Sequence, residues 1–202
     1  MYFINAPFFL RWYFPKVTWN KSRKEKKVYL TFDDGPIPEL TPFVLDTLAQ
    51  YGIKGTFFCV GENVERHPEI YQRILAEGHA VGNHTHNHLR GWDCDDETYL
   101  ANVAQCDALT QSKLFRPPYI RATKSQLRAL RKDYEIVLYD VLSGDFDLSL
   151  SPEGCYNNVI RYTKPGSIIV FHDNVKAKPR IEYALPRSIA YLQERGFAFG
   201  TL

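Results

Sequence analysis

Strand-like and helix-like segments alternate along almost the whole chain. The strand candidates cover residues 28–33, 55–60, 80–83, 113–116, 135–141, 167–172 and 197–202. The helix candidates lie between them, at residues 40–51, 68–77, 96–110, 124–132, 152–162 and 186–195. This alternation favours an α/β fold with a parallel sheet, because parallel strands need crossover connections. About seven strands are typical of an incomplete, distorted (β/α) barrel, whose chemistry lies at the carboxyl ends of the strands.

Length and charge limit the classes of protein that fit. A chain of 202 residues fits one domain with a sizeable core. We expect that domain to cover residues 27–202 and an N-terminal arm, residues 1–26, to pack on it. The net charge of +2 predicts no nucleic-acid partner and no acidic partner.

The N-terminal residues do not match a secretory signal. Pro7 and Arg11 interrupt the aromatic-rich start, and neither a basic leading segment nor a small-residue cleavage site accompanies it. No run approaches the ~20 apolar residues of a transmembrane segment. We therefore expect a cytoplasmic or unassigned location. Weak membrane-surface association is the alternative, because Trp12, Tyr13 and Trp19 suit a lipid–water interface.

The four cysteines, Cys59, Cys94, Cys106 and Cys155, show no C-x-x-C spacing. Free thiols are the expectation in the absence of a secretion signal. A disulfide between Cys94 and Cys106 stays open as an alternative.

Two adjacent aspartates, Asp33 and Asp34, come at the end of an apolar strand candidate and precede Gly35-Pro36. Two carboxylates at the mouth of a strand repel each other and are costly to desolvate together. A nearby cation relieves this cost. One carboxylate can then bind the metal while the other stays free as a base.

Three of the six histidines fall within residues 84–88. The i, i+4 spacing of His84 and His88 would place both imidazoles on one face of a helical turn. Together with Asp34 they make a two-histidine, one-carboxylate set that leaves one position open, as catalytic zinc sites require. If the segment were an extended strand, the ligand pair would instead be His84 with His86, or His86 with His88.

Five ordered motifs carry a family resemblance. Residues 31–36 (Thr-Phe-Asp-Asp-Gly-Pro) and the pattern His84-Thr85-x-x-His88 resemble the first two motifs of the NodB-like polysaccharide deacetylases, carbohydrate esterase family 4. Residues 116–119, 143–146 and 170–173 resemble the next three motifs. The resemblance runs from about residue 27 to the C-terminus, and it implies the same incomplete barrel.

The resemblance implies a metal-dependent hydrolase that removes N-acetyl groups from amino-sugar residues of a glycan, in peptidoglycan, a chitin-like polymer or a related glycan. Asp34, His84 and His88 would hold one divalent ion, which polarises the carbonyl and lowers the pKa of the attacking water. Zinc is the first expectation, and cobalt, nickel, manganese or iron are compatible. Asp33 would act as the base and His172 as the acid.

Two further roles concern the orientation and charge of these groups. By resemblance, Arg116 would pair with Asp33 and hold it ionised, with a purely structural salt bridge as the alternative. Asp145 would keep His172 charged by raising its pKa.

The remaining candidates line the pocket. The resemblance assigns the backbone N–H of Tyr119 to the oxyanion, and Phe146 and Val170 to the acetyl methyl group, with a simple core role as the alternative for Phe146 and Val170. The fourth motif departs from the family pattern, because Leu142 stands where an aspartate is usual and Phe146 where a tryptophan is usual. We expect altered substrate fit rather than lost chemistry. Asp140 and Asp147 are the candidates for the missing carboxylate.

Other activities remain open for the same residues. An O-acetyl esterase acting on xylan-type sugars would use the same groups, as would a de-N-formylase or small-amide amidohydrolase. A glycan-binding module without turnover is less favoured, because ligands, base and acid are retained together. The expected partner is an acetylated carbohydrate.

Overall fold

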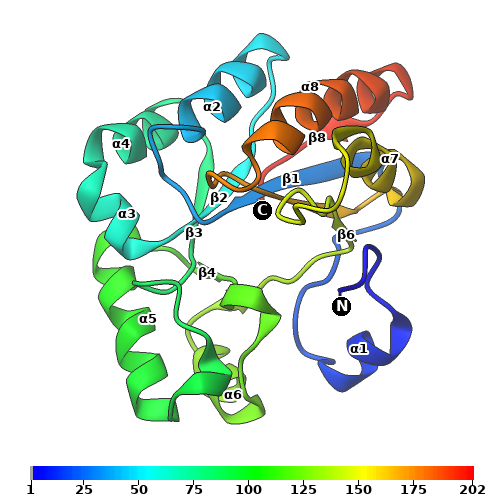
Figure 1. The fold of residues 1–202 in the computed structure, drawn as a ribbon. Helices are drawn as coiled ribbons and strands as arrows, with labels where there is room; N and C mark the ends of the chain where they lie inside the picture. Colours follow the sequence, from blue (N-terminus) through cyan, green and yellow to red (C-terminus); the bar gives the residue numbers. More distant parts are fainter. Residues whose placement is uncertain (1) are drawn as a thin grey trace.

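The computed structural model describes residues 2–202, which form an incomplete, distorted (β/α) barrel, as predicted (Figure 1). Seven parallel strands follow in the order β5-β4-β3-β2-β1-β7-β6, and β8 pairs with the start of β1. The strands are β1 (Lys27–Asp33), β2 (Thr56–Cys59), β3 (Ala80–Asn83), β4 (Leu114–Phe115), β5 (Glu135–Ile136), β6 (Val141–Leu142), β7 (Ile168–His172) and β8 (Ala198–Phe199).

Helices surround the strands on the outside of the barrel (Figure 1). In the described residues these are α1 (Phe8–Tyr13), α2 (Thr41–Gln50), α3 (Gly61–Arg66), α4 (Pro68–Ala76), α5 (Asp96–Thr110), α6 (Lys124–Leu130), α7 (Pro152–Tyr162) and α8 (Lys178–Glu194). Short 3-10 helices cover Gly91–Asp93 and Pro118–Ile120. The predicted segments 152–162 and 96–110 match α7 and α5, whereas α1 and α3 were not predicted.

The core is centred on β1. Its residues are buried on both faces over the last four positions, as expected for a central parallel strand. Phe32 lies between Phe57 and Phe171 on the two neighbouring strands, with ring centroids 5.0 Å and 6.3 Å away. These stacked rings pack below the end of β1, so they support the backbone that carries Asp33.

The predicted strand 135–141 is wrong as one continuous strand. Its first two residues pair with β4 as β5, its last residue begins β6, which pairs with β7, and residues 137–140 belong to neither strand. The two edges of the open barrel are therefore bridged by a single stretch of chain. Other backbone groups in this stretch bond to the N-terminal arm, as Thr18 shows by accepting from Leu138 N and donating to Ile136 O, both at 2.8 Å.

The predicted start of the last helix at Pro186 is also wrong, because α8 begins at Lys178 and continues through this proline. A proline inside a helix costs about 3 kcal/mol through its missing N–H and its steric clash. The buried positions Ile181, Leu185, Ile189 and Leu192 recur every three to four residues across it. Burial of this continuous apolar stripe against the sheet offsets the cost of the proline.

The arm lies against the open side of the barrel, near β6 (Figure 1). Ile4 O accepts a hydrogen bond from Leu142 N at 2.8 Å, and Arg11 and Arg23 both pair with the buried Asp140. The arm residues Ala6 and Trp19 are buried in an apolar cluster with Leu138, Tyr139, Leu142 and Val170. These contacts make the arm part of the barrel wall.

Truncation of Phe32 tests the proposed centre of the core. We expect Phe32→Ala to lower the free energy of unfolding by about 3–5 kcal/mol, because it leaves a cavity between two stacked rings. Urea denaturation followed by circular dichroism measures the change. Phe8→Ala is the matched control, since Phe8 is 82% exposed, and it should change stability by less than about 0.5 kcal/mol. Equal losses in the two variants would contradict this description of the core.

Candidate active site

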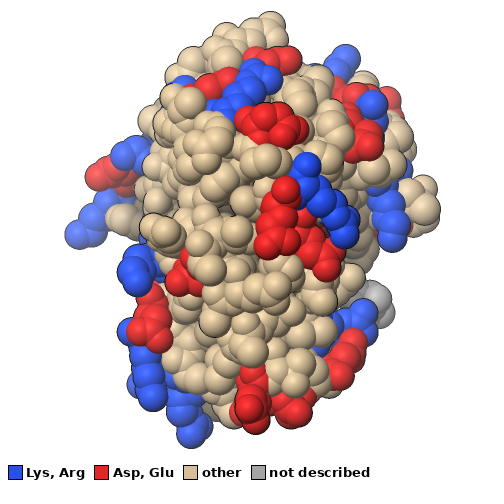
Figure 2. Space-filling model, turned by 90° about the vertical axis from the view of Figure 1, so that its left-hand side faces the viewer, with Lys and Arg blue, Asp and Glu red and all other residues tan. Residues whose placement is uncertain are grey.

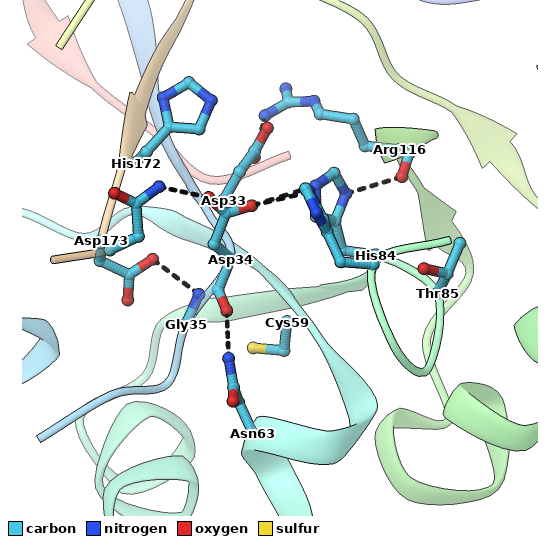
Figure 3. Close-up of polar contacts among 12 residues, drawn as sticks. Asp33, Asp34, Gly35, Cys59, Asn63, His84, Thr85, Arg116, His172 and Asp173 are labelled. Atoms are coloured by element: carbon cyan, nitrogen blue, oxygen red, sulfur yellow. Dashed lines mark hydrogen bonds and ion pairs between the residues drawn. The ribbon is translucent and has the colours of Figure 1, made fainter. Parts of the chain in front are cut away.

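The candidate site lies at the carboxyl ends of β1, β3 and β7. Asp33 is the last residue of β1, and it is in register with His172 at the end of β7. The next residue, Asp34, has a left-handed backbone (φ 89°), which ends the side-chain alternation of the strand, and both carboxylates line the same cavity. Figure 3 shows both carboxylates between His172 on one side and His84 with Arg116 on the other.

Asp34, His84 and His88 meet at one point. Asp34 Oδ1 lies 3.5 Å from His84 Nε2 and 3.1 Å from His88 Nε2. Among the described residues, this is the group of three possible ligands whose atoms all lie within 4.8 Å of one another. Burial raises the pKa of Asp34, but its close contacts with the His84 and His88 imidazoles outweigh burial and hold the pKa well below its usual range.

The donor set fits a metal ion. Asp34 Oδ1 is buried and accepts no well-formed hydrogen bond within residues 2–202, although two imidazole nitrogens face it. A buried carboxylate oxygen in this position is costly unless a cation neutralises it. Mixed nitrogen and oxygen ligands in a set of three match the protein part of a catalytic zinc site.

The predicted helical turn at residues 84–88 is wrong. The segment is an irregular loop in which Thr85 and His88 both have left-handed φ, at 63° and 58°. Side chains support this loop, since Asn83 Oδ1 accepts from Thr85 N and Thr85 Oγ1 accepts from Leu89 N, each at 2.9 Å. The loop backbone, rather than helical periodicity, brings His84 and His88 together.

His86 points elsewhere, so neither alternative ligand pair is formed. Its Nε2 lies 3.8 Å from Glu65 Oε2. Its ring also packs against Gly61 so closely that a Cβ on this glycine would lie 2.5 Å from His86 Nδ1. By contrast, His84 Nδ1 lies 2.8 Å from Arg116 O, which directs its Nε2 toward Asp34.

Three residues that sequence reasoning did not assign to the site hold Asp34 in place. Asn174 Nδ2 donates to Asp34 Oδ2 at 2.5 Å, and Asn63 Nδ2 donates to Asp34 O at 2.7 Å. Asp173 Oδ1 accepts from Gly35 N at 3.0 Å. The position of Asp173 and Asn174 directly after His172, past the end of β7, is the sequence signal that points to them.

Arg116 holds the other carboxylate. Its Nη1 donates to Asp33 Oδ1 at 2.6 Å and to Thr31 Oγ1 at 2.8 Å. The guanidinium is buried, 4.0 Å above the ring of Phe58. Burial lowers the pKa of Arg116, and the Asp33 carboxylate acts in the opposite direction. The charge of Asp33 is therefore compensated by Arg116 and not by the histidine pair.

Neither candidate for the missing carboxylate of the fourth motif contacts Arg116. Asp140 forms salt bridges with Arg11 and Arg23 of the arm, and Asp147 accepts a hydrogen bond from Tyr2 Oη at 2.7 Å. The remaining guanidinium donors bond to backbone carbonyls instead, with Arg116 Nη2 3.0 Å from Leu138 O. Leu142 packs in the apolar cluster with Ala6 and Trp19 of the arm, which explains why an apolar residue is accommodated there.

His172 is held by a dedicated carboxylate. Asp145 Oδ1 lies 2.8 Å from His172 Nδ1, and Asp145 Oδ2 accepts from His172 N at 2.6 Å. Burial lowers the pKa of His172, but the charge of Asp145, with smaller contributions from Asp34 and Asp33, raises it to about 9. The imidazole is therefore protonated at neutral pH, and its Nε2 is not engaged by Asp145.

A cavity of about 1110 Å³ joins these groups. Its walls include Tyr119, Phe146 and Val170, together with Tyr2 and Trp19 of the arm. Phe146 makes edge contacts with His172 and with Tyr2, at centroid distances of 5.1 Å and 4.9 Å. The cavity is much larger than an acetyl group, so it accommodates at least part of a larger molecule.

Two other expectations concern cysteines and membrane segments. Cys94 and Cys106 are free thiols, as are Cys59 and Cys155, so the alternative disulfide is not formed. Within residues 2–202, the helices are too short or too polar to cross a bilayer.

Acidic and basic side chains are intermixed on the face at the left of Figure 1, in line with the small net charge (Figure 2).

Comparison with known proteins identifies the family. The polysaccharide deacetylase family model matches residues 20–138. A peptidoglycan-N-acetylglucosamine deacetylase of Bacillus cereus is 34% identical over 92% of this chain and 91% of its own length. The chain belongs to the polysaccharide deacetylase family. A chitooligosaccharide deacetylase of Sinorhizobium fredii is 31% identical over 87% of this chain and 89% of its own length.

Solved structures of the family have the same fold. A peptidoglycan N-acetylglucosamine deacetylase in complex with a naphthalenyl N-oxidanyl-benzamide has a TM-score of 0.90 at 32% identity, over 98% of this chain and 95% of that chain. The Xyl-CE4 domain of a multidomain xylanase from the hindgut metagenome of Trinervitermes trinervoides has a TM-score of 0.79 at 31% identity, over 89% and 88%. This chain is therefore a hydrolase of the polysaccharide deacetylase family. The family and the enzyme class predicted from the sequence are confirmed.

Removal of the Asp34 carboxylate tests the ligand set. We expect Asp34→Ala to lose stoichiometric zinc after dialysis, because two imidazoles alone leave the ion with too few protein ligands. Inductively coupled plasma mass spectrometry measures zinc per chain. Asp46→Ala is the control, since its carboxylate is exposed and bonds Arg73, and it should bind zinc like the wild type. Retention of zinc by Asp34→Ala would contradict the assignment.

Proposed function

We propose that this chain removes N-acetyl groups from amino-sugar residues of a glycan, with peptidoglycan and chitin-like oligosaccharides as the substrate class. The deacetylase activities for which its relatives in Bacillus cereus and Sinorhizobium fredii are named support this class. The observation that carries the proposal is the meeting of a metal-ligand triad, a free carboxylate oxygen and a protonated imidazole at one cavity.

The ligands would be Asp34, His84 and His88, and the mixed donor set suits zinc, with cobalt, nickel, manganese or iron compatible. A divalent ion bound there supplies Lewis-acid polarisation of the acetyl carbonyl and acidifies water. Asn174 and the contact of His84 with Arg116 fix the orientation of two of the three ligands.

Asp33 is the proposed general base. Arg116 occupies Asp33 Oδ1, so Oδ2 is the oxygen that accepts the proton of the attacking water. The guanidinium keeps the Asp33 carboxylate oriented and compensates its negative charge before substrate binds. Because Arg116 itself is anchored by Thr31 and by backbone carbonyls, the base has a fixed position.

His172 is the proposed general acid. Its Nδ1–H donates to Asp145, so Nε2 carries the proton that moves to the departing amine nitrogen. Amide cleavage depends on this step, because an unprotonated amine is a poor leaving group. We assign the backbone N–H of Tyr119 to the carbonyl oxygen as charge develops on it, and Phe146 and Val170 to the acetyl methyl group.

Acetate release from N-acetylglucosamine oligomers tests the reaction. We expect turnover by the zinc-loaded chain, loss of turnover with chelator, and a fall in kcat of about 10²–10⁴ in Asp33→Asn with zinc content unchanged. Asp46→Asn serves as a control with an exposed carboxylate. A near-wild-type rate in Asp33→Asn would exclude this base. Acetate release from acetylated xylan alone would instead favour the O-acetyl esterase.

The pH profile tests the role of Asp145. An acid with a pKa of about 9 is protonated below that pH, so the alkaline fall in kcat/KM reports its deprotonation. Asp145→Asn removes the charge that raises this pKa, so the alkaline limb should move to lower pH, toward the ordinary value of 6.5. Asp147→Asn, two residues away, bonds Tyr2 and not His172 and should leave the limb in place. An unmoved limb in Asp145→Asn would contradict the assignment of the acid.

A further inference from the structure

The exposed surface of α1 and the adjacent α6 differs from the rest of the molecule. We call it the arm face and define it by four aromatic residues, Phe8, Phe9, Trp12 and Tyr13, and five cations, Lys16, Lys124, Arg128, Arg131 and Lys132. Phe8 and Trp12 are 82% and 81% exposed. Their i, i+4 spacing places both on the same side of α1. Large aromatic side chains in contiguous solvent-exposed groups are uncommon on proteins that have no partner there.

The cations of the arm face lie beside these aromatic residues. Lys124 Nζ is 3.7 Å from the centre of the Tyr13 ring, so α6 contacts α1 directly. Lys16 of the arm and Arg128, Arg131 and Lys132 line one shallow hollow. Within residues 2–202, none of these five cations has a carboxylate within 4.0 Å.

Acidic side chains also lie close to this surface. Glu135, on the rim of the hollow, pairs with Lys21 at 2.7 Å. Asp133 follows Lys132 in sequence, and Asp96 Oδ1 accepts from Thr123 Oγ1, next to Lys124, at 3.2 Å. The arm face therefore keeps a positive charge next to its exposed aromatic residues.

We propose that the arm face binds the surface of a bilayer that contains anionic lipids. Aromatic side chains suit the headgroup region, and nearby lysine and arginine side chains are attracted to anionic headgroups. Helix α1 has six residues and rises about 9 Å, so it lies in the interface without crossing it. A second copy of the chain fits this surface less well, because a two-fold contact would place the same five cations opposite one another.

The geometry connects this surface to the catalytic cavity. Leu10 and Phe14 of the arm line that cavity, whereas Phe8 and Trp12 face solvent. Tyr13 belongs to both sets, since it lines the cavity and is 49% exposed. The proposal goes beyond the proposed function, because vesicle binding can be measured whether or not the chain turns over a glycan.

Co-sedimentation with unilamellar vesicles tests the proposal. We expect the full chain to sediment with vesicles of phosphatidylcholine and phosphatidylglycerol at low salt, and much less with phosphatidylcholine alone or at high salt. Phe8→Ser combined with Trp12→Ser should reduce the fraction bound at least tenfold. Lys124→Glu and Arg128→Glu should each reduce binding about fivefold or more, from the loss of one cation at the surface.

Matched control variants distinguish binding by the arm face from nonspecific binding of the protein to vesicles. Leu148→Ser removes an apolar side chain that is 72% exposed outside the arm face, and Lys54→Glu reverses an exposed charge elsewhere. Both should bind vesicles like the wild type. Circular dichroism confirms that each variant is folded.

Three results would overturn the proposal. The first is equal sedimentation with anionic and neutral vesicles, and the second is wild-type binding by the Phe8/Trp12 variant. The third is a concentration-dependent dimer, seen by light scattering, that the Phe8/Trp12 variant abolishes while vesicle binding is absent. That result would assign the arm face to a second copy of the chain.

Discussion

Two adjacent carboxylates at the end of one buried strand need separate sources of positive charge. Asp33 obtains it from Arg116, whose guanidinium lies 2.6 Å away in the barrel interior. Asp34, whose left-handed backbone ends the strand, faces two imidazoles instead. A single shared cation would make both carboxylates ligands and leave no base. In the proposed mechanism, the separation of the two environments lets one aspartate bind metal while its neighbour accepts a proton.

This separation requires a rigid frame. Breaking a buried ion pair by removing one partner typically costs about 3–5 kcal/mol, so the Arg116–Asp33 pair is stable only as a unit. Gly35 makes the turn possible, because a Cβ there would lie 1.9 Å from Asp173 Oδ2. Asp173, Asn174 and Asn63 then fix the backbone and the carboxylate of Asp34 from three sides. The residues proposed as ligand, base and acid, namely Asp34, Asp33 and His172, are all carried on the packed ends of β1 and β7.

The sequence predicted the parts of this site that depend on strand ends. Apolar runs followed by Asp33, His84, Arg116 and His172 place these residues at one edge of a parallel sheet, and they meet there. It did not predict how residues 84–88 bring two histidines together, because left-handed φ at Thr85 and His88 has no local glycine signal. Asn174 and Asn63 were missed because a lone asparagine has no pattern that distinguishes it from a solvated loop residue.

In the fold, too, the sequence predicted the elements that local residues determine and not those that depend on residues far away in the chain. The helices α5 and α7 have clear caps, with Asp95 Oδ1 accepting from Thr98 N and Ser151 Oγ from Gly154 N, and their extents were predicted. The split of residues 135–141 between two sheet edges depends on the arm, which is more than a hundred residues away in sequence. The arm also compensates for the departure at Leu142 by packing Ala6 and Trp19 against it.

Anomalous X-ray diffraction at the zinc edge from crystals of the zinc-loaded chain is the most direct test of the central claim. We predict one strong peak at about 2.0–2.2 Å from a carboxylate oxygen of Asp34 and from Nε2 of both His84 and His88. Asp33 should stay on Arg116, outside the coordination sphere. An ion ligated by Asp33 or His86, or a peak away from these side chains, would contradict the division of roles between the two aspartates.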